Sequence, residues 1–246
     1  MFFLKDVELN KNRRPFLTDT SIIDVRVNHS DILIGNSASM DSQRDCLLAA
    51  IGELFERGML SYSRIDEINS KKEVYAYSLV DECIKKEDMY LFYTHKCHND
   101  FDSSGLATHV ISELSIKNSF EEYVERQSYI YSYLSKTPGM KIIMNKYPKF
   151  YKFVSIFKNC KYEFYNISLT KQMYVIIGLA LKDDELYIGI NCSSNLDNAI
   201  EGCIQEMIQC KWGYDLKKSQ NYNKPTTFKI NDYGEIYFNL SGERLW

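Results

Sequence analysis

The sequence predicts an α+β fold in which antiparallel or mixed sheets alternate irregularly with helices. Two observations carry this prediction. Short segments rich in isoleucine, valine and tyrosine occur in pairs around turn residues, which is typical of hairpins, and longer segments show the 3.6-residue apolar period of helices. Because hairpins join antiparallel strands, the pattern favours α+β over a doubly wound parallel sheet.

The first third of the chain is expected to contain two strands and a long helix. Residues 21–27 and 31–35 are rich in isoleucine and valine and flank the turn sequence 28–30. Asp41 is a capping residue, and the apolar side chains after it follow a helical period. A helix is therefore expected to begin there.

The middle of the chain predicts a strand, two helices and a polar loop. A strand is expected at 74–77, followed by a short helix at about 79–86 and a loop at 94–104 that is rich in His, Asn, Asp and Ser. Residues 117–134 are expected to form a second long helix. The sequence Thr-Pro-Gly at 137–139 is expected to end it, because proline and glycine do not continue a helix.

The last part predicts a helix, a three-stranded meander and a third long helix. A helix is expected at 149–157 and another at 196–211. The strands of the meander are expected at 163–169, 173–181 and 185–191, and a further hairpin is centred on 232–234.

Composition limits the class of protein. With 45% hydrophobic and 26% charged residues the 246-residue chain is globular, and since no linker rich in Gly, Ser or Pro divides it, a single domain over residues 1–246 is predicted. The net charge of −3 gives no basic field, so nucleic acid is not an expected partner.

The cysteines and the apolar segments indicate a cytoplasmic protein. The seven cysteines are odd in number and form no Cys-x-x-Cys pair, which argues against the disulfide framework of a secreted protein. The N-terminus lacks the features of a signal peptide, and the longest apolar run, 175–181, is too short to span a bilayer. No membrane association is expected.

The pattern Glu-x-x-Glu-Arg occurs twice, at 53–57 and at 122–126, each time within a predicted helix. Positions i, i+3 and i+4 share one helix face, so each copy places two carboxylates and a guanidinium together. Carboxylates with phosphates hold Mg²⁺, and arginine matches phosphate oxygens. One copy alone reads as a solvated helix face, but the repetition suggests an internal duplication whose two helices bind a Mg²⁺-nucleotide between them.

Three segments, taken in order, resemble the ATP-binding motifs of the YcaO family. The first motif, Ser-x-x-x-Glu-x-x-Glu-Arg, is matched except that alanine replaces its serine, and the third motif is Ala-x6-Glu-x-x-Gln. The resemblance covers roughly residues 30–212. The matching residues are Glu53, Glu56 and Arg57 (with Ala49 in place of the serine), then Asn118, Glu122, Glu125 and Arg126, then Ala199, Glu206 and Gln209.

This resemblance implies an enzyme that uses ATP and Mg²⁺ to activate the oxygen of a peptide bond. In the family, a Cys, Ser or Thr side chain or an external nucleophile attacks a backbone amide, whose oxygen is phosphorylated and leaves as phosphate, giving an azoline, a thioamide or an amidine. No catalytic side chain is assigned. The implied Mg²⁺ ligands are Glu53, Glu56, Glu122 and Glu125, and the implied nucleotide-binding residues are Arg57, Asn118, Arg126, Glu206 and Gln209.

Three departures from the family pattern affect this expectation. The stretch 35–40 lacks the lysine expected before the first helix, and Lys211 stands where the family commonly has arginine. The family also continues well beyond this point, whereas the sequence ends at Trp246, so a shortened member is expected.

Together these features predict a cyclodehydratase-type subunit of ribosomal peptide biosynthesis. Its substrate would be a precursor peptide, and because no leader-peptide-binding module is recognisable, a partner protein is implied. Assembly into a homo- or hetero-oligomer is left open. The alternative is a degenerate, non-catalytic subunit that scaffolds a modification complex.

Two other candidate sites are weaker. His95, Cys97 and His98, with His109 nearby, are residue types that bind Zn²⁺, but four ligands at a standard spacing are not evident, so an ordinary polar loop is favoured. The aromatic cluster at 147–157 would suit a peptide or stacked bases, although an amphipathic core helix explains it more simply.

Overall fold

Three antiparallel sheets and four α-helices make up the part of the chain that the structure describes, which confirms the α+β prediction. The computed structural model describes residues 7–11, 21–28, 32–39, 43–59, 73–78, 80–88, 104–182 and 185–219. The predicted polar loop, with His95, Cys97 and His98, lies almost wholly outside these residues, as does the hairpin at 232–234. None of the described helices is long and apolar enough to cross a bilayer.

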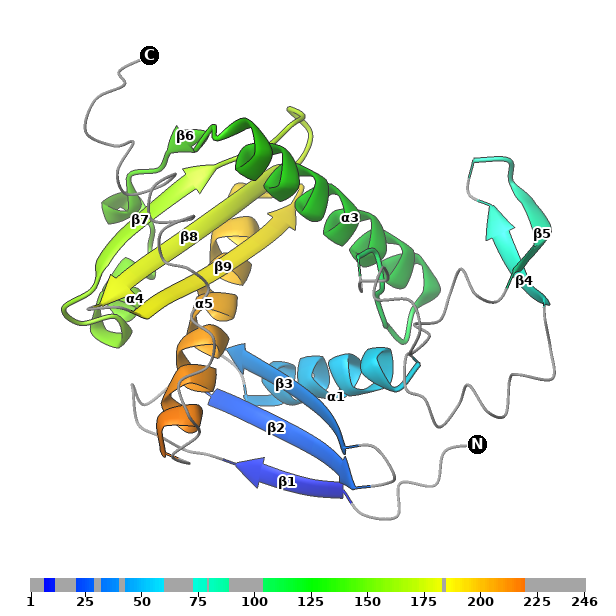
Figure 1. Ribbon diagram of the computed structural model, residues 1–246, viewed down its shortest axis with the longest axis horizontal. Coiled ribbons are helices and arrows are strands. Elements are labelled where there is room, and N and C mark those ends of the chain that lie inside the picture. Colours follow the sequence, from blue (N-terminus) through cyan, green and yellow to red (C-terminus); the bar gives the residue numbers. More distant parts are fainter. Residues whose placement is uncertain are drawn as a thin grey trace.

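The first sheet has the order β1-β2-β3 and supports the first helix, α1 (Figure 1). The two predicted strands are confirmed and extend further at their ends, whereas β1 was not expected. Helix α1 packs on β3 through Cys46, Ala50 and Leu54, which recur every four residues and are all buried. These elements are β1 (Val7–Lys11), β2 (Ser21–Asn28), β3 (Ile32–Ser39) and α1 (Gln43–Met59).

The second sheet is a hairpin of β4 (Glu73–Ser78) and β5 (Cys83–Asp88), so the helix predicted at about 79–86 is wrong. Residue 82 has a left-handed φ of 51°, which a helix cannot continue through. Ser78 closes the turn because its hydroxyl donates to Asp81 at 2.8 Å and accepts from the Asp81 N–H at 3.1 Å. Such side-chain bonds favour a turn over a helix.

Helix α3 (Ser112–Ser135) confirms the second predicted helix and begins five residues earlier. It ends at Lys136, which adopts a left-handed conformation and donates its N–H to the carbonyl oxygens of Ser132 and Tyr133. Pro138 follows two residues later and prevents any continuation.

The third sheet has the order β6-β7-β8-β9 and includes the predicted meander (Figure 1). Helix α4 confirms the core interpretation of the aromatic cluster. Phe153 and Phe157 are almost fully buried, and the ring of Phe153 lies 5.1 Å from that of Phe164. The elements are β6 (Met140–Lys141), the 3-10 helix η2 (Met144–Lys146), α4 (Phe150–Ile156), β7 (Lys161–Asn166), β8 (Tyr174–Lys182) and β9 (Glu185–Ser193).

Both faces of this sheet are covered. Ile176 and Ala180 of β8 pack with α4 and α5 (Leu196–Ser219), whereas Val175 and Ile177 pack on the face towards α3. This is why β8 reads as a continuous apolar run. Helix α5 is longer than the predicted 196–211 and also contacts β3, so it joins the two halves of the molecule.

The contact between α5 and β9 depends on Gly189. A Cβ atom at this position would lie 2.1 Å from the Cys203 carbonyl oxygen and 2.7 Å from the Met207 nitrogen, and both are backbone atoms of α5. We expect Gly189→Ala to lower the free energy of unfolding by about 2 kcal/mol or more, as measured by urea denaturation. Gly52→Ala is the control, because its Cβ would meet only Thr108 O at 3.8 Å, and it should not destabilise. Equal effects of the two substitutions would contradict this packing.

Candidate functional site

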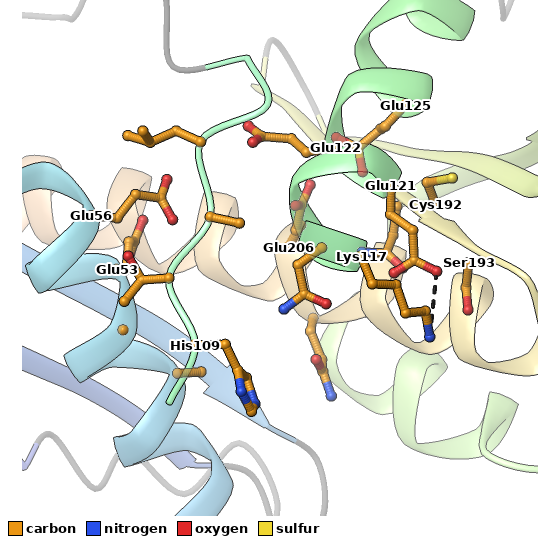
Figure 2. A pocket seen from close by; sticks show the side chains of 18 of the residues that line it. Glu53, Glu56, His109, Lys117, Glu121, Glu122, Glu125, Cys192, Ser193 and Glu206 are labelled. Carbon is orange, nitrogen blue, oxygen red and sulfur yellow. Dashed lines mark ion pairs between the residues drawn. The ribbon is translucent and has the colours of Figure 1, made fainter. Parts of the chain in front are cut away.

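A cleft of about 900 Å³ opens between α1, α3, α5, the end of β9 and the segment 106–109. Figure 2 shows Glu53 and Glu56 of α1 on one side and Glu121 and Glu122 of α3 on the other, with Glu206 between them. Six glutamates line the cleft against one lysine and one arginine among the described residues. The lining residues are Leu48, Ala49, Gly52, Glu53, Glu56, Leu106, Ala107, Thr108, His109, Lys117, Asn118, Glu121, Glu122, Glu125, Arg126, Asn191, Cys192, Ser193, Asn198, Gln205 and Glu206.

Helix α1 directs Glu53 and Glu56 into the cleft because the neighbouring face of the helix packs on β3. Cys46 anchors this face through its thiol, which donates to the Ser37 carbonyl oxygen at 3.2 Å. The next stripe around the helix, which includes Ala49, then points into the cleft and leaves Glu53 and Glu56 half-buried.

Helix α3 contributes a stripe that runs from Lys117 to Arg126. The Arg126 guanidinium lies 3.7 Å from the Glu122 carboxylate. The Lys117 ammonium lies 3.7 Å from the Glu121 carboxylate, and Figure 2 marks this second ion pair. Both ion pairs span i, i+4, as a helix face allows. Oε1 of Glu121, the oxygen that Lys117 approaches, is buried and makes no hydrogen bond with the described residues.

Helix α5 and strand β9 hold two carboxylates together. Strand β9 is an edge of its sheet, and alternate N–H groups therefore point away from β8. The Ile190 N–H donates to Glu206 at 2.9 Å, and the Cys192 N–H donates to Glu125. The strand edge thus fixes one carboxylate from α5 and one from α3 side by side.

Burial and mutual repulsion raise the pKa of both carboxyls. Burial first, and then the Glu206 charge, raise the pKa of Glu125 to about 9, against the lowering effect of Arg126. Burial also raises the pKa of Glu206 to about 7, although the Ile190 N–H bond and Arg126 lower it. The negative charges of Glu122 and Glu53 add to this rise. Such a pair is stabilised by an added cation.

The donor set fits a hard divalent cation that shares its coordination with a ligand. Among the described residues, no group of three or more His, Cys, Asp and Glu side chains lies close enough to hold a metal by itself. Mg²⁺ is usually held by one or two carboxylates together with phosphates and water, so an all-protein cage is not required. Burial raises the pKa of Cys192 to about 12, so this thiol is protonated in the metal-free protein.

The structure brings most of the residues expected from the sequence into this one cleft. Glu53, Glu56, Asn118, Glu122, Glu125, Arg126 and Glu206 all line it. Arg57 belongs to α1, but its side chain lies outside the described part of the structure. Gln209 lies one turn beyond Glu206 on α5 and is not among the described lining residues, whereas Gln205 is.

Several lining residues were not expected from the sequence. Lys117 and Glu121 lie on the same side of α3 as Asn118 and Glu122, so a helical-wheel projection of the sequence would have identified them. Asn191 comes from β9 and Asn198 from the first turn of α5, and only the tertiary fold places them at the cleft.

A family model described as YcaO cyclodehydratase, ATP- and Mg²⁺-binding, matches residues 76–236 of the sequence. This match begins after α1. The position of Glu53 and Glu56 in the cleft is therefore an observation independent of the family match. A comparison with curated proteins finds no match.

Solved structures share the fold at low sequence identity. The E. coli microcin synthetase McbBCD complex with pro-MccB17 bound contains a chain with a TM-score of 0.73 and 15% identity, with 89% of the present chain and 67% of that chain covered. YcaO from Methanopyrus kandleri bound with AMPPCP and Mg²⁺ gives 0.72 and 14%, with 94% and 69% covered. A heterocyclase in complex with substrate and cofactor gives 0.69 and 13%, with 92% and 39% covered. The chain thus spans about two thirds or less of these proteins.

Proposed function

The chain belongs to the YcaO family, and from this we propose that it binds Mg²⁺-ATP in the cleft and uses it to activate backbone amides of a peptide. The family is described as ATP- and Mg²⁺-binding cyclodehydratases. The observation that carries the proposal is the convergence of carboxylates from α1, α3 and α5 on a single cleft, where the pKa of Glu125 and that of Glu206 are raised.

The proposed role of the cleft side chains is to position phosphates and neutralise their charge. Glu53, Glu56, Glu122 and Glu125 are proposed to supply oxygen ligands to Mg²⁺, with Glu206 as a further ligand. Bound Mg²⁺ would offset the charge of the phosphate oxygens. Phosphoryl transfer needs mainly such positioning and electrostatic stabilisation, so no covalent protein intermediate is required.

The cationic and amide groups are proposed to bind the nucleotide. Arg126 offers a planar fork for phosphate oxygens, and Lys117 offers a point charge from the same helix. Asn118 supplies amide donors beside them. Arg57 is proposed to bind phosphate as well. Gln209 is not a lining residue, whereas Gln205 is, so Gln209 is proposed to affect nucleotide binding only indirectly, by positioning α5.

We further propose a balanced reaction. A Cys, Ser or Thr side chain of the peptide attacks the preceding carbonyl carbon and loses its proton to solvent. The carbonyl oxygen takes the γ-phosphoryl group of ATP, releasing ADP, and then leaves as phosphate while the amide nitrogen loses its proton. The peptide thereby loses the elements of one water molecule and keeps its number of residues.

The substrate and its delivery are also proposals. One structural neighbour is a synthetase complex with pro-MccB17 bound, which supports a precursor peptide as substrate and a partner protein that presents it. A reducing cytoplasm suits the six described cysteines, none of which forms a disulfide.

A non-catalytic scaffold is the second candidate. It is supported by Ala49, which replaces the serine of the first motif, and by Lys211, which replaces an arginine. In this case the cleft would keep its shape without supporting turnover.

The test is to incubate the protein, with proteins encoded beside it, with ATP, Mg²⁺ and the neighbouring precursor peptide. The proposal predicts ADP release that depends on the peptide, and a peptide product that has lost water. Glu53→Gln should abolish both. A product of unchanged mass and no ADP, from a protein that still joins the complex, would favour the scaffold.

Lys117 provides a separate test of nucleotide binding. Since charged hydrogen bonds contribute about 1.5–3 kcal/mol, Lys117→Met should weaken the binding of Mg²⁺-AMPPCP about tenfold or more. Lys152→Met on α4, outside the lining residues, is the matched control and should bind normally. Calorimetric titration measures both, and equal affinities would remove Lys117 from the site.

A further inference from the structure

Helix α3 packs the apolar side chains of Val124, Tyr129 and Tyr133 on the third sheet, where they are only partly buried. Its buried residues are Glu125, Ser128 and Ser132, none of which is apolar. The opposite face carries Phe120 and Leu134, which are 56% and 73% exposed. A surface helix normally buries its apolar stripe, so this outer face is expected to contact something further.

The exposed residues follow a heptad. Spacings of four and three alternate along the outer face without interruption, as at the a and d positions of a coiled-coil seam. Five of the six positions are apolar, and all six are exposed. We call this set the α3 stripe: Ile116, Phe120, Tyr123, Gln127, Ile130 and Leu134.

We propose that the α3 stripe docks against the α3 stripe of a second copy of this chain, with the two helices antiparallel. An antiparallel pair related by a two-fold axis places each a position opposite a d position. Phe120 then faces Ile130 of the second copy, and Ile116 faces Leu134. Gln127 faces Tyr123, which gives the one polar position a hydrogen-bonding partner.

Charge favours the antiparallel arrangement over the parallel one. Glu113 lies in the first turn of α3 and Lys136 at its C-terminal cap, and both are exposed. Antiparallel helices bring Glu113 of one copy to Lys136 of the other at both ends, and they also oppose the helix dipoles. Parallel helices would place like charges together.

The available area suits a modest dimer. The stripe and its exposed neighbour Tyr131 present on the order of 600 Å² of surface, compared with about 800 Å² per partner in a standard interface. Since Glu125 lies on the opposite side of α3, docking through the stripe leaves the cleft open.

Sedimentation equilibrium of the full chain tests the proposal. We expect a dimer whose dissociation constant rises more than a hundredfold in Phe120→Glu/Ile130→Glu, with an unchanged circular dichroism spectrum. Tyr151→Glu, which changes an exposed aromatic residue on α4, is the control and should leave the dimer intact. A monomeric wild type, or a dimer insensitive to the double substitution, would overturn the proposal.

A charge exchange tests the orientation. Glu113→Lys and Lys136→Glu should each weaken the dimer several-fold by creating repulsion, and the two together should restore it. If the combined variant is weaker than either single variant, the antiparallel arrangement is wrong.

Discussion

Glu206→Gln is expected to abolish Mg²⁺-dependent binding of AMPPCP and at the same time to stabilise the ligand-free protein. The carboxylate is desolvated and repelled by its neighbours, so its pKa is about 7. At pH 8 this environment costs the fold on the order of 3 kcal/mol, which the neutral amide avoids. The glutamine side chain still offers an oxygen to the Ile190 N–H, so the local fold should persist.

The measurement is differential scanning calorimetry at pH 8, with and without Mg²⁺-AMPPCP. We expect the ligand-free melting temperature of Glu206→Gln to lie several degrees above that of the wild type, and the shift caused by the ligand to vanish. Glu201→Gln is the matched control on the same helix. It loses an ion pair with Lys149 at 2.8 Å, so it should be slightly less stable but should keep the ligand-induced shift. A ligand-induced shift that survives in Glu206→Gln would exclude this residue from the site.

The second large effect is a fall in stability with rising pH when Mg²⁺ is absent. The pKa of Glu125 is raised to about 9 and that of Glu206 to about 7, from a value of 4.5 in the unfolded chain. Between about pH 4.5 and these values the folded protein binds more protons than the unfolded protein. The free energy of unfolding therefore decreases with pH, by about 1.4 kcal/mol per pH unit for each carboxyl.

The contribution of these two carboxyls to the pH dependence of the free energy of unfolding is measured by comparing the wild type with Glu125→Gln/Glu206→Gln. Both proteins are denatured with urea from pH 5 to 9 in EDTA. We expect the difference in stability between the two proteins to grow with pH in favour of the variant. The affinity of the wild type for Mg²⁺ should rise over the same range, because metal ligands must be deprotonated. A stability difference that does not depend on pH would contradict the buried, repelling pair.

The parts of the site that depend on one helix were predictable from the sequence. The i, i+3, i+4 spacing in 53–57 and 122–126 places their carboxylates on one face whatever the tertiary fold, and the structure turns both faces to one cleft. The same reasoning applied further along α3 would have included Lys117 and Glu121. What the spacing could not supply is the pairing of Glu125 with Glu206, because the N–H donors of Ile190 and Cys192 exist only at a sheet edge.

The helix expected at about 79–86 shows the corresponding failure. Charged residues such as Lys85 and Lys86 have high helix propensity, but the pairing of β5 with β4 decides the structure. Lys86 lies over the ring of Tyr75 and 3.0 Å from Glu73, both across the hairpin. These cross-strand contacts are not visible in a local pattern.

The central claim is that carboxylates from three helices form one site for a Mg²⁺-nucleotide. Isothermal titration calorimetry of the wild type with AMPPCP, in Mg²⁺ and in EDTA, tests it most directly. We expect one nucleotide bound per chain in Mg²⁺ and an affinity at least a hundredfold weaker in EDTA, because the ionised glutamates of the cleft repel uncompensated phosphates. Equal affinity in both buffers, or no binding in Mg²⁺, would contradict it.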